Sequence, residues 1–484
     1  MQAHVSSSAD FRDETLEERL DKLYLYPDRK DAFAMTISKT LPEHTEAACE
    51  QVDGREGIEY RSCRVKNLCF ALKPLRWFYL RPSIFVKDEK KYAVNVGGSP
   101  GYIMSTLLRN ITYDPQEAIE ENDAVLHVHT PAMLFARYLP GNFYHRLHDD
   151  FLPLVLQMAA YADLNKRDGN VPRLLVFADR FSASFDNTLH DPFGSVLHID
   201  QFGDLNFGPN MNPKIVCFSN AFVGTPSKSL WFQSAMHSSV FKPEDVFPPS
   251  VTDRTLTALA KWVRKIFDIP SVDAHSTSKL YKALLSNPTG MYPQSIPRLK
   301  LTVIRRERYR KIRNETALLD ALKSAFPMVD VVTFSEEHYS SSKDIISAAA
   351  GSFAIIGVHG ALLASAIFMP KGSMLVEIMP FAVSNTVMGY YKTLGNFPTL
   401  GLHYRGMMSA GGDEHGPWDQ ERVNCLDVLP PSYQQGVKSN SSIPNFPCCF
   451  NIFWHYRSGQ DVEADIPFVI RSLKEMMLEQ VNKS

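Results

Sequence analysis

Four segments of the sequence combine residue types that could bind or catalyse. The first is GNFYHRLHDDFLPL, which gathers His145, His148, Asp149 and Asp150 within six residues. If a helix begins near His145, then His145 and Asp149 stand at positions i and i+4 and share one face. A histidine beside a carboxylate can serve as a general base with its orienting partner, or the group could hold a metal. The alternative is an ordinary helix start, where acidic residues favour the helix dipole.

The second segment is rich in arginine and directly follows an expected strand. It reads LTVIRRERYRKIRNE and contains Arg306 and Arg310. Guanidinium groups bind phosphate oxygens in a fixed fork, so a loop of this kind at the end of a strand suits a diphosphate. The alternative is a charged loop that only faces solvent. A P-loop is excluded, because GxxxxGK[ST] does not occur in the chain.

The third segment, GVHGALLASAIFMPKGSMLVEIMP, places His359, Gly360 and Ala361 at an expected junction between a strand and a helix. Free backbone N–H groups at such a junction can bind an anion. Glu377 follows at the end of the next expected strand, where an acidic residue can accept ribose hydroxyls. The alternative is a structural turn with a buried histidine, since no GxGxxG is present.

The remaining candidates are an aromatic–acidic pair and the cysteines. Trp418 and Asp419 lie in GPWDQ, where they could stack on and hydrogen-bond a sugar or base, or simply anchor a loop. Cys63 and Cys69 are one candidate disulfide pair, but the connectivity of the seven cysteines stays open. No CxxC or HExxH motif occurs, and we predict no metal site.

Length and composition narrow the class of protein without naming an activity. The chain has 484 residues, enough for about three domains. Its net charge of −2 argues against a nucleic-acid binder, which normally has a basic excess. The 26 residues from Ile345 to Pro370 carry no charge, but their glycines, serines and histidine favour a strand, a turn and a helix over a membrane span. Four Asn-X-Ser/Thr sequons, at Asn110, Asn314, Asn440 and Asn482, weakly favour a secretory protein.

The elements that must position these residues alternate between strands and helices, which indicates α/β architecture. We expect strands at 63–72, 172–179, 214–224, 299–306, 329–334, 352–358 and 374–379, and helices at 149–164, 255–267, 314–326, 338–351 and 361–368. A proline-containing stretch at 244–254 is expected to link two halves of similar character. This pattern suggests two Rossmann-like domains facing a cleft.

Together these segments resemble family 61 glycosyltransferases. The third segment is the most specific, with HGA, F-x-P-x-G and E-I-x-P, and the second matches R-x-x-x-R-x-I-x-N. The segments CFSNAFVG, PWDQ, the paired Cys448 and Cys449, and YRSGQDVEADIP are similar to the family members that extend O-linked mannose. The resemblance runs from about residue 60 to about residue 475.

The resemblance implies an inverting transferase of the GT-B type that moves N-acetylglucosamine from UDP to O-linked mannose on a protein, as on α-dystroglycan. It implies the lumen of the endoplasmic reticulum as the place of action. The expected domains are an N-terminal extension at 1–60, an acceptor-side Rossmann-like domain at 61–246, a nucleotide-sugar domain at 247–430, and a C-terminal tail at 431–484 that packs back on the lobes. We expect no membrane anchor and no fibronectin type III domain within this chain, although the resembling enzymes carry both.

The resemblance also suggests roles for the residues. Asp149 would be the base, with His145 as the alternative, and Asp150, Trp418 and Asp419 would line the acceptor side or cleft. The diphosphate would meet Arg306, Arg310, His359, Gly360 and Ala361, and Glu377 would hold the ribose. These segments contain no DxD motif, so we expect no cofactor and no metal requirement.

Two other functions remain open. One is a family 61 transferase with another acceptor or donor, such as an EGF-domain O-GlcNAc transferase or a xylosyltransferase. The other is a non-catalytic relative that binds glycans or nucleotides.

Overall fold

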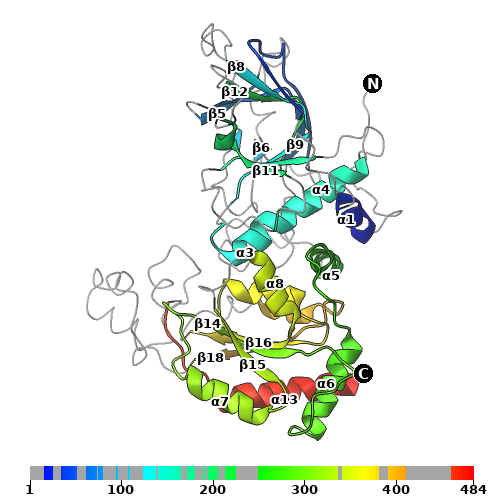
Figure 1. Cartoon of the computed structure of the whole chain (residues 1–484), viewed down its shortest axis with the longest axis vertical. Coiled ribbons are helices and arrows are strands. Elements are labelled where there is room, and N and C mark those ends of the chain that lie inside the picture. Colours follow the sequence, from blue (N-terminus) through cyan, green and yellow to red (C-terminus); the bar gives the residue numbers. More distant parts are fainter. Residues whose placement is uncertain are drawn as a thin grey trace, which may run out of the picture. The chain divides into compact units, whose positions relative to one another are not determined.

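The computed structural model divides the chain into two compact units, Met1–Ser229 and Leu230–Ser484, which Figure 1 draws together. It describes residues 16–24, 34–51, 61–72, 75–79, 94–95, 107–108, 124–137, 140–164, 172–179, 189–190, 195–203, 205, 213–224, 249–335, 341–380, 391–409 and 459–483. Both units are mixed α/β structures with parallel strands, as the sequence predicts. The predicted domain boundaries at residues 246 and 430 fall outside the described residues and stay predictions.

The second unit contains a parallel sheet of five described strands in the order β15-β14-β16-β17-β18. The strands are β14 (Lys300–Arg305), β15 (Asp330–Ser335), β16 (Ser352–Val358), β17 (Met374–Met379) and β18 (His403–Met408). Every residue of β16 and β17 is buried, which is typical of parallel strands covered on both faces. The first two strands in chain order lie on one side of β16 and the last two on the other. The order therefore reverses between β14 and β16, and in open parallel sheets ligands bind at the carboxyl ends of the strands at such a point.

Helices cover both faces of this sheet (Figure 1). One face carries α5 (Pro249–Ile266), α8 (Ser342–Ala350) and η10 (Ala361–Phe368); the other carries α6 (Ala274–Ser286), α7 (Glu315–Ala325) and α13 (Ile466–Lys483). A short helical turn, η11 (Thr393–Asn396), precedes β18. In α13 the buried residues Val469, Leu473, Met476 and Met477 follow the helical repeat, so one apolar stripe joins the core.

The first unit contains two mixed sheets that share one core. One sheet has the order β1-β8-β12-β4-β5, the other β11-β10-β9-β13-β3-β2. The first sheet consists of β1 (Met35–Ser38), β8 (Ala124–Val128), β12 (Pro213–Phe218), β4 (Leu68–Leu72) and β5 (Leu75–Tyr79). The second consists of β11 (Ser195–His198), β10 (Leu174–Phe177), β9 (Ala132–Phe135), β13 (Ala221–Val223), β3 (Arg61–Lys66) and β2 (Glu46–Gln51). A separate pair joins β6 (Val94–Asn95) to β7 (Leu107–Leu108).

Only part of this unit is parallel, which departs from the Rossmann-like sheet that the sequence predicts. The strands β11, β10, β9 and β13 run parallel, and so do β8 and β12, but the other neighbours are antiparallel. The described helices are α1 (Leu16–Tyr24), α3 (Phe143–His145), η5 (Arg146–Phe151), α4 (Leu152–Leu164) and η7 (Ile199–Gly203). Helix α1 packs against α4 (Figure 1).

Two predicted boundaries are wrong where the structure describes them. The extension at 1–60 includes β1 and β2, but β1 pairs with β8 and β2 pairs with β3, so both belong to the sheets of the first unit. The linker at 244–254 includes the start of α5. Pro249 opens this helix, at a position where its missing N–H costs no hydrogen bond. Asp253, one turn further on, is buried and accepts hydrogen bonds from the backbone N–H groups of Thr399 and Leu400.

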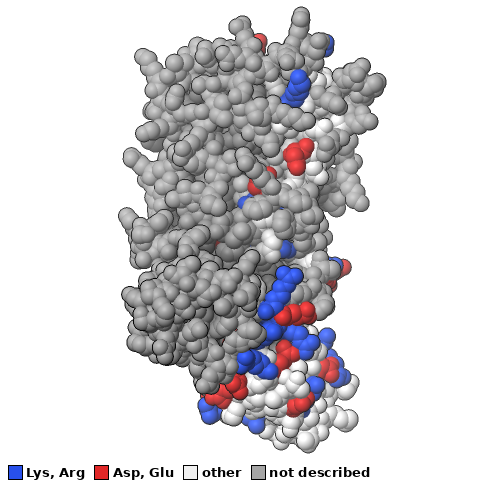
Figure 2. Space-filling model, turned by 90° about the vertical axis from the view of Figure 1, so that its left-hand side faces the viewer, with Lys and Arg blue, Asp and Glu red and all other residues white. Residues whose placement is uncertain are grey.

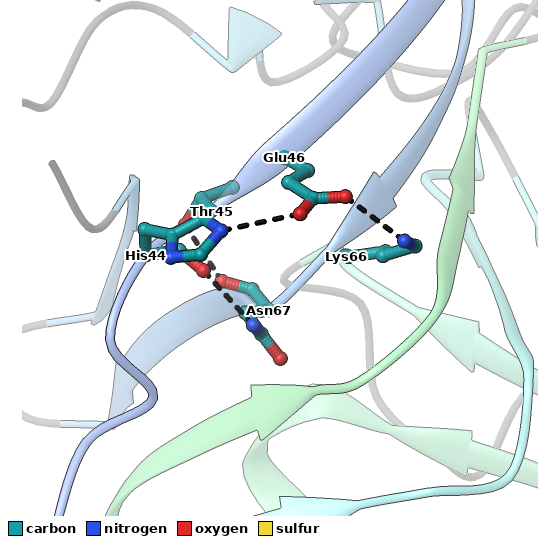
Figure 3. Close-up of polar contacts among 5 residues, drawn as sticks. All are labelled: His44, Thr45, Glu46, Lys66 and Asn67. Carbon is teal, nitrogen blue, oxygen red and sulfur yellow. Dashed lines mark hydrogen bonds and ion pairs between the residues drawn. The ribbon is translucent and has the colours of Figure 1, made fainter. Parts of the chain in front are cut away.

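The strand predicted at 63–72 is broken at Asn67, which has a positive φ of 55°. Asparagine tolerates this left-handed conformation better than most residues. Figure 3 shows how polar contacts fix the turn: the Asn67 side-chain amide donates to the carbonyl of His44, and the Thr45 hydroxyl donates to the carbonyl of Asn67. Beside them Glu46 accepts from Lys66 at the exposed edge of β2 and β3. The turn allows the two halves of the predicted strand to enter different sheets.

A disulfide joins Cys69 of β4 to Cys217 of β12, which face each other across an antiparallel pair. The candidate pair Cys63–Cys69 is therefore wrong, although Cys63 is itself disulfide-bonded. Within the described residues, the helices are all too short or too polar to cross a bilayer. The uncharged stretch from Ile345 to Pro370 folds as the end of α8, then β16, then η10, as predicted.

Candidate active site

In the first unit, Asp149 lies between two histidines. Its Oδ2 accepts from Nδ1 of His145 at 2.5 Å, and its Oδ1 accepts from Nδ1 of His148 at 2.7 Å. The side chains of Asp149 and His148 are buried, whereas that of His145 is 18% exposed. The predicted meeting of His145 and Asp149 is confirmed. Of the three groups, the imidazole of His145 is the one that reaches the surface.

A change of helix type positions this cluster. Asn142 begins α3, where its side chain accepts from the backbone N–H of His145. The chain then winds for six residues as the π-helix η5 before α4 continues, and every residue of η5 is buried. Single π turns inside α-helices are rare, and many of those that occur lie at functional sites. Asp150 is also fully buried in this turn.

The electrostatics of the cluster keep Asp149 ionised. Burial by itself raises the pKa of the Asp149 carboxyl, but the hydrogen bonds and charges of His145 and His148 outweigh it and lower the pKa to about 2. Such a carboxylate is a weak base at neutral pH. It is well suited to accept a hydrogen bond from a protonated Nδ1 and so to orient an imidazole.

In the second unit, the predicted diphosphate residues meet where the strand order reverses. Arg306 and Arg310 follow β14, and His359 and Gly360 follow β16. The Nη1 of Arg310 donates to the His359 carbonyl at 2.7 Å. A Cβ placed on Gly360 would lie 2.1 Å from Nη1 of Arg306 and 3.6 Å from Nη1 of Arg310. Position 360 therefore has to be glycine for the Arg306 guanidinium to lie against the backbone there.

Tyr391 also contacts this junction, and its hydroxyl donates to the carbonyl of Gly360 at 2.7 Å. Ala361 begins η10 directly after Gly360. The ring of Tyr391 also lies 5.6 Å from that of His359. Tyr391 was not predicted, because it lies beyond the three motif segments.

Glu377 contacts His359 and is fully buried. Its Oε1 accepts from Nδ1 of His359 at 2.5 Å, and its Oε2 accepts from the hydroxyl of Tyr404 at 2.7 Å. Burial, followed by the charge of Glu377, raises the pKa of the Tyr404 hydroxyl, so the tyrosine stays a donor. Both carboxylate oxygens are bonded inside the protein, which does not match a direct contact between Glu377 and a ribose. Tyr404 was missed because nothing in the sequence of β18 marks it.

The arginines of the arginine-rich segment have different partners. Arg305 forms an ion pair with Glu315 of α7, so its charge is neutralised locally. The guanidinium groups of Arg306 and Arg310 lie 5.3 Å and 5.7 Å from the ring centre of Tyr309, within reach of cation–π attraction. Figure 2 shows Lys and Arg side chains gathered in one zone of the described surface with Asp and Glu among them, although the net charge of the chain is near zero.

The segment 459–464 binds the chain just after Arg310. Asp461 accepts from the backbone N–H of Lys311 at 2.9 Å, and Val462 exchanges backbone hydrogen bonds with Lys311 and Arg313. The side chain of Asn314 makes two hydrogen bonds to the backbone of Ala464. Asn314 begins α7 as predicted, but its side chain does not cap that helix. Because this amide is already bonded, the sequon at Asn314 is not available for a glycan in the folded state.

A second buried polar group in the first unit was not predicted. Arg137 and Asp179, which follow β9 and β10, form a buried two-point ion pair with contacts of 2.8 and 2.9 Å. His198 at the end of β11 lies 3.4 Å from Arg137, and burial lowers the pKa of its imidazole, with a further effect from Arg137. The carboxyl ends of parallel strands bring the three together. Charged residues directly after apolar strands were the available signal.

Several predictions fall outside the described residues. These are the roles of Trp418 and Asp419 and any bond of Cys448 or Cys449. Among the residues that the structure does describe, no group of three or more His, Cys, Asp or Glu side chains is arranged to hold a metal ion.

Comparison with known proteins shows which class of protein the chain resembles. Residues 143–376 match the family model described as Glycosyltransferase 61. This segment begins at the first residue of α3 and contains the His145–Asp149 cluster, both arginines and His359. The segment is therefore similar to family 61 glycosyltransferases, which confirms the predicted resemblance and supports a glycosyltransferase.

Relatives from several vertebrates to which the chain is similar carry the name protein O-linked-mannose β-1,4-N-acetylglucosaminyltransferase 2. The proteins of Bos taurus and Homo sapiens are both 25% identical to it over 479 residues. That of Pan troglodytes is 27% identical over the same length. In each case the alignment covers 96% of this chain and 75% of the relative.

Proposed function

We propose that the protein transfers N-acetylglucosamine from UDP-N-acetylglucosamine to O-linked mannose on a protein acceptor, with inversion at the sugar carbon. The observation that carries the donor assignment is the pair Arg306 and Arg310 at Gly360, where the strand order of a parallel sheet reverses. The names of the relatives support the acceptor and the linkage. We further propose the GT-B arrangement, in which the two units supply the acceptor and donor sides.

In this mechanism His145 is the general base. Its Nδ1–H donates to Asp149, so the neutral imidazole carries its lone pair on Nε2. Nε2 takes the proton of the acceptor hydroxyl while the hydroxyl oxygen attacks the anomeric carbon, and the bond to the UDP oxygen breaks. Asp149 holds the ring and stabilises the imidazolium that forms. The low pKa and the full burial of Asp149 support this division over a direct base role for the carboxylate.

UDP leaves as an anion, and the chain can supply positive charge to it. Arg306 and Arg310 offer two guanidinium groups, and backbone N–H groups at the start of η10 add donors beside Gly360 and Ala361. We propose that these groups suffice without a metal ion or other cofactor. Glu377 then orients His359 beside the diphosphate, and we replace its predicted ribose contact by this role because both of its oxygens are already bonded.

The proposal also covers the acceptor side and the compartment. Asp150, Trp418 and Asp419 stay proposed acceptor or cleft residues. We propose the lumen of the endoplasmic reticulum as the site of action. The disulfide between Cys69 and Cys217 supports an oxidising compartment, since such bonds are rare in the reducing cytosol.

The deciding experiment incubates the protein with radiolabelled UDP-N-acetylglucosamine and an O-mannosyl peptide, with the unmodified peptide as the control. Transfer to the O-mannosyl peptide alone supports the proposal. Transfer only to a folded EGF module would change the acceptor class, and transfer only from UDP-xylose would change the donor. UDP binding without turnover on any of these would indicate a non-catalytic relative. Adding EDTA to the active reaction tests metal independence, which predicts an unchanged rate.

A further inference from the structure

Arg310 has a backbone conformation that few side chains adopt. Its φ is 58°, in the left-handed region, which is unfavourable for a non-glycine residue. Residues persist in this region only where their surroundings hold them, and they concentrate at functional sites. The conformation turns the chain so that the Arg310 guanidinium reaches the His359 carbonyl at 2.7 Å.

The neighbours that hold this turn come from a distant part of the sequence. Directly after Arg310, the backbone N–H of Lys311 donates to Oδ1 of Asp461, and the Lys311 carbonyl accepts from the N–H of Val462. Ile312 and Val462 then pair as a parallel bridge, and the N–H of Arg313 donates to the Val462 carbonyl. The residues that follow Arg310 are thus fixed by backbone contacts and by one carboxylate.

Among residues 461–464, Asp461 bonds the backbone after Arg310 through its side chain. It is 3% exposed, and the Nζ of Lys311 lies 3.8 Å from its second oxygen. Burial raises the pKa of this carboxyl, so its charge is retained at some cost to the folded state. An asparagine could accept the same hydrogen bond without a buried charge.

We propose that Asp461 is a positioning residue of the donor site: by binding the Lys311 N–H it holds Arg310 in the left-handed conformation that brings its guanidinium to the nucleotide diphosphate. The inference rests on the proposed UDP site. It extends that site to a residue 151 positions from Arg310 that touches neither arginine side chain in any described contact.

The test measures UDP binding by titration calorimetry for the wild type, Asp461→Leu and Asp461→Asn. We expect Asp461→Leu to raise the Kd for UDP at least about tenfold, and Asp461→Asn to stay within about threefold of wild type because the acceptor oxygen is kept. The matched control is Asp465→Leu, which removes the side-chain acceptor for the Phe468 N–H at the start of α13. That change should lower Tm and leave the Kd for UDP within about threefold.

Hydrogen exchange gives a second readout that does not depend on the ligand. In Asp461→Leu the amides of Lys311 and Arg313 should exchange faster, while those of Val303 and Ile304 in β14 stay protected. Unchanged exchange at Lys311, or unchanged UDP binding in Asp461→Leu, would overturn the positioning role and leave the donor site standing. A wild-type protein that binds no UDP would overturn the proposed donor site and this inference with it.

Discussion

The imidazole of His145 donates from Nδ1 to the buried carboxylate of Asp149 at 2.5 Å, and the same carboxylate binds His148. This arrangement suits His145 and Asp149 to different roles. The partly exposed imidazole can exchange a proton with a substrate, and the fully buried carboxylate can hold it in one tautomer.

The first prediction concerns the base. Replacing His145 by Ala should lower kcat by roughly 10²–10⁴-fold, the usual contribution of a positioned acid–base group. Asp149→Asn should also lower kcat, because an amide no longer fixes the Nδ1–H tautomer, and the pH dependence of kcat should change. Both are measured by sugar transfer, with the exposed His44→Ala as the control. Near-normal kcat in His145→Ala together with an inactive Asp149→Asn would return the base role to the carboxylate.

The second prediction concerns acid stability. The pKa of Asp149 is about 2 in the folded protein, and that of an unfolded Asp is about 3.9. A lowered folded-state pKa stabilises the protein above the unfolded pKa, and this stabilisation is lost as the pH falls through about 4 to about 2. The loss is about 2–3 kcal/mol of unfolding free energy, measured by urea unfolding at a series of pH values. As the pH falls, the free energy of unfolding should decline less steeply in Asp149→Asn than in the wild type or in the exposed Asp320→Asn. Parallel curves for all three proteins would contradict the low pKa of Asp149.

The third prediction concerns the close approach at Gly360. In Gly360→Ala the new methyl group would occupy the space of the Arg306 guanidinium, so that side chain has to move. The Kd for UDP should rise about tenfold, as in Arg306→Ala, while Tm changes little because Arg306 is flexible. Gly351→Ala is the control, since its methyl group would make only ordinary contacts. An unchanged UDP affinity in both Gly360→Ala and Arg306→Ala would remove Arg306 from the donor site.

The fourth prediction concerns the hydroxyl of Tyr404. Tyr404→Phe removes one of the two hydrogen bonds to the buried Glu377 and leaves an unmatched acceptor, at a cost of about 1–3 kcal/mol. Because Glu377 holds His359, the Kd for UDP should rise several-fold in addition. Tyr292→Phe removes hydroxyl hydrogen bonds elsewhere in the same unit and should affect Tm alone. Equal effects of the two variants on UDP binding would argue against the link to His359.

The fifth prediction concerns the disulfide. Cys69 and Cys217 are 148 residues apart, so opening the bond frees a long loop and should lower the free energy of unfolding by about 2–5 kcal/mol. Cys217→Ser and Cys69→Ser should each lower Tm, and the double variant should be no less stable than either one. Dithiothreitol should lower the Tm of the wild type by more than that of the double variant, which keeps the disulfide of Cys63. If the losses of unfolding free energy in the two single variants added up in the double variant, the two cysteines would not stabilise the protein through a shared disulfide.

Local patterns in the sequence predicted four of the five described strands of the parallel sheet, because buried parallel strands are apolar and easy to recognise, but they did not predict α6, β18 or α13. The strands SFAIIGV and MLVEIM and the junction at His359 are where the pattern predicts. The pairing of β1 with β8 was not predictable, since its four residues are only partly buried and their partner lies about 90 residues away. The π-helix likewise has no sequence pattern that distinguishes it from an α-helix start.

The site was predictable wherever a motif carried it, and not where distant residues complete it. His145, Asp149, Arg306, Arg310 and His359 stand in recognisable segments. Tyr391, Tyr404 and Asp461 reach these segments through contacts made by tertiary structure, and their neighbours in sequence give no indication of them. The hydrogen bond between Glu377 and Tyr404 was not predicted for the same reason.

The contact between Asp461 and Lys311 also has a consequence for the order of synthesis. The two residues are 150 positions apart, so the arginine loop cannot take its final form on the ribosome until residues 461–464 have emerged. Contacts of this length form late, since the loop must close before they contribute. A nascent chain stopped short of this segment would contain the strands of the parallel sheet before the arginine loop takes its final form, so under the proposed function it could not yet use a nucleotide sugar.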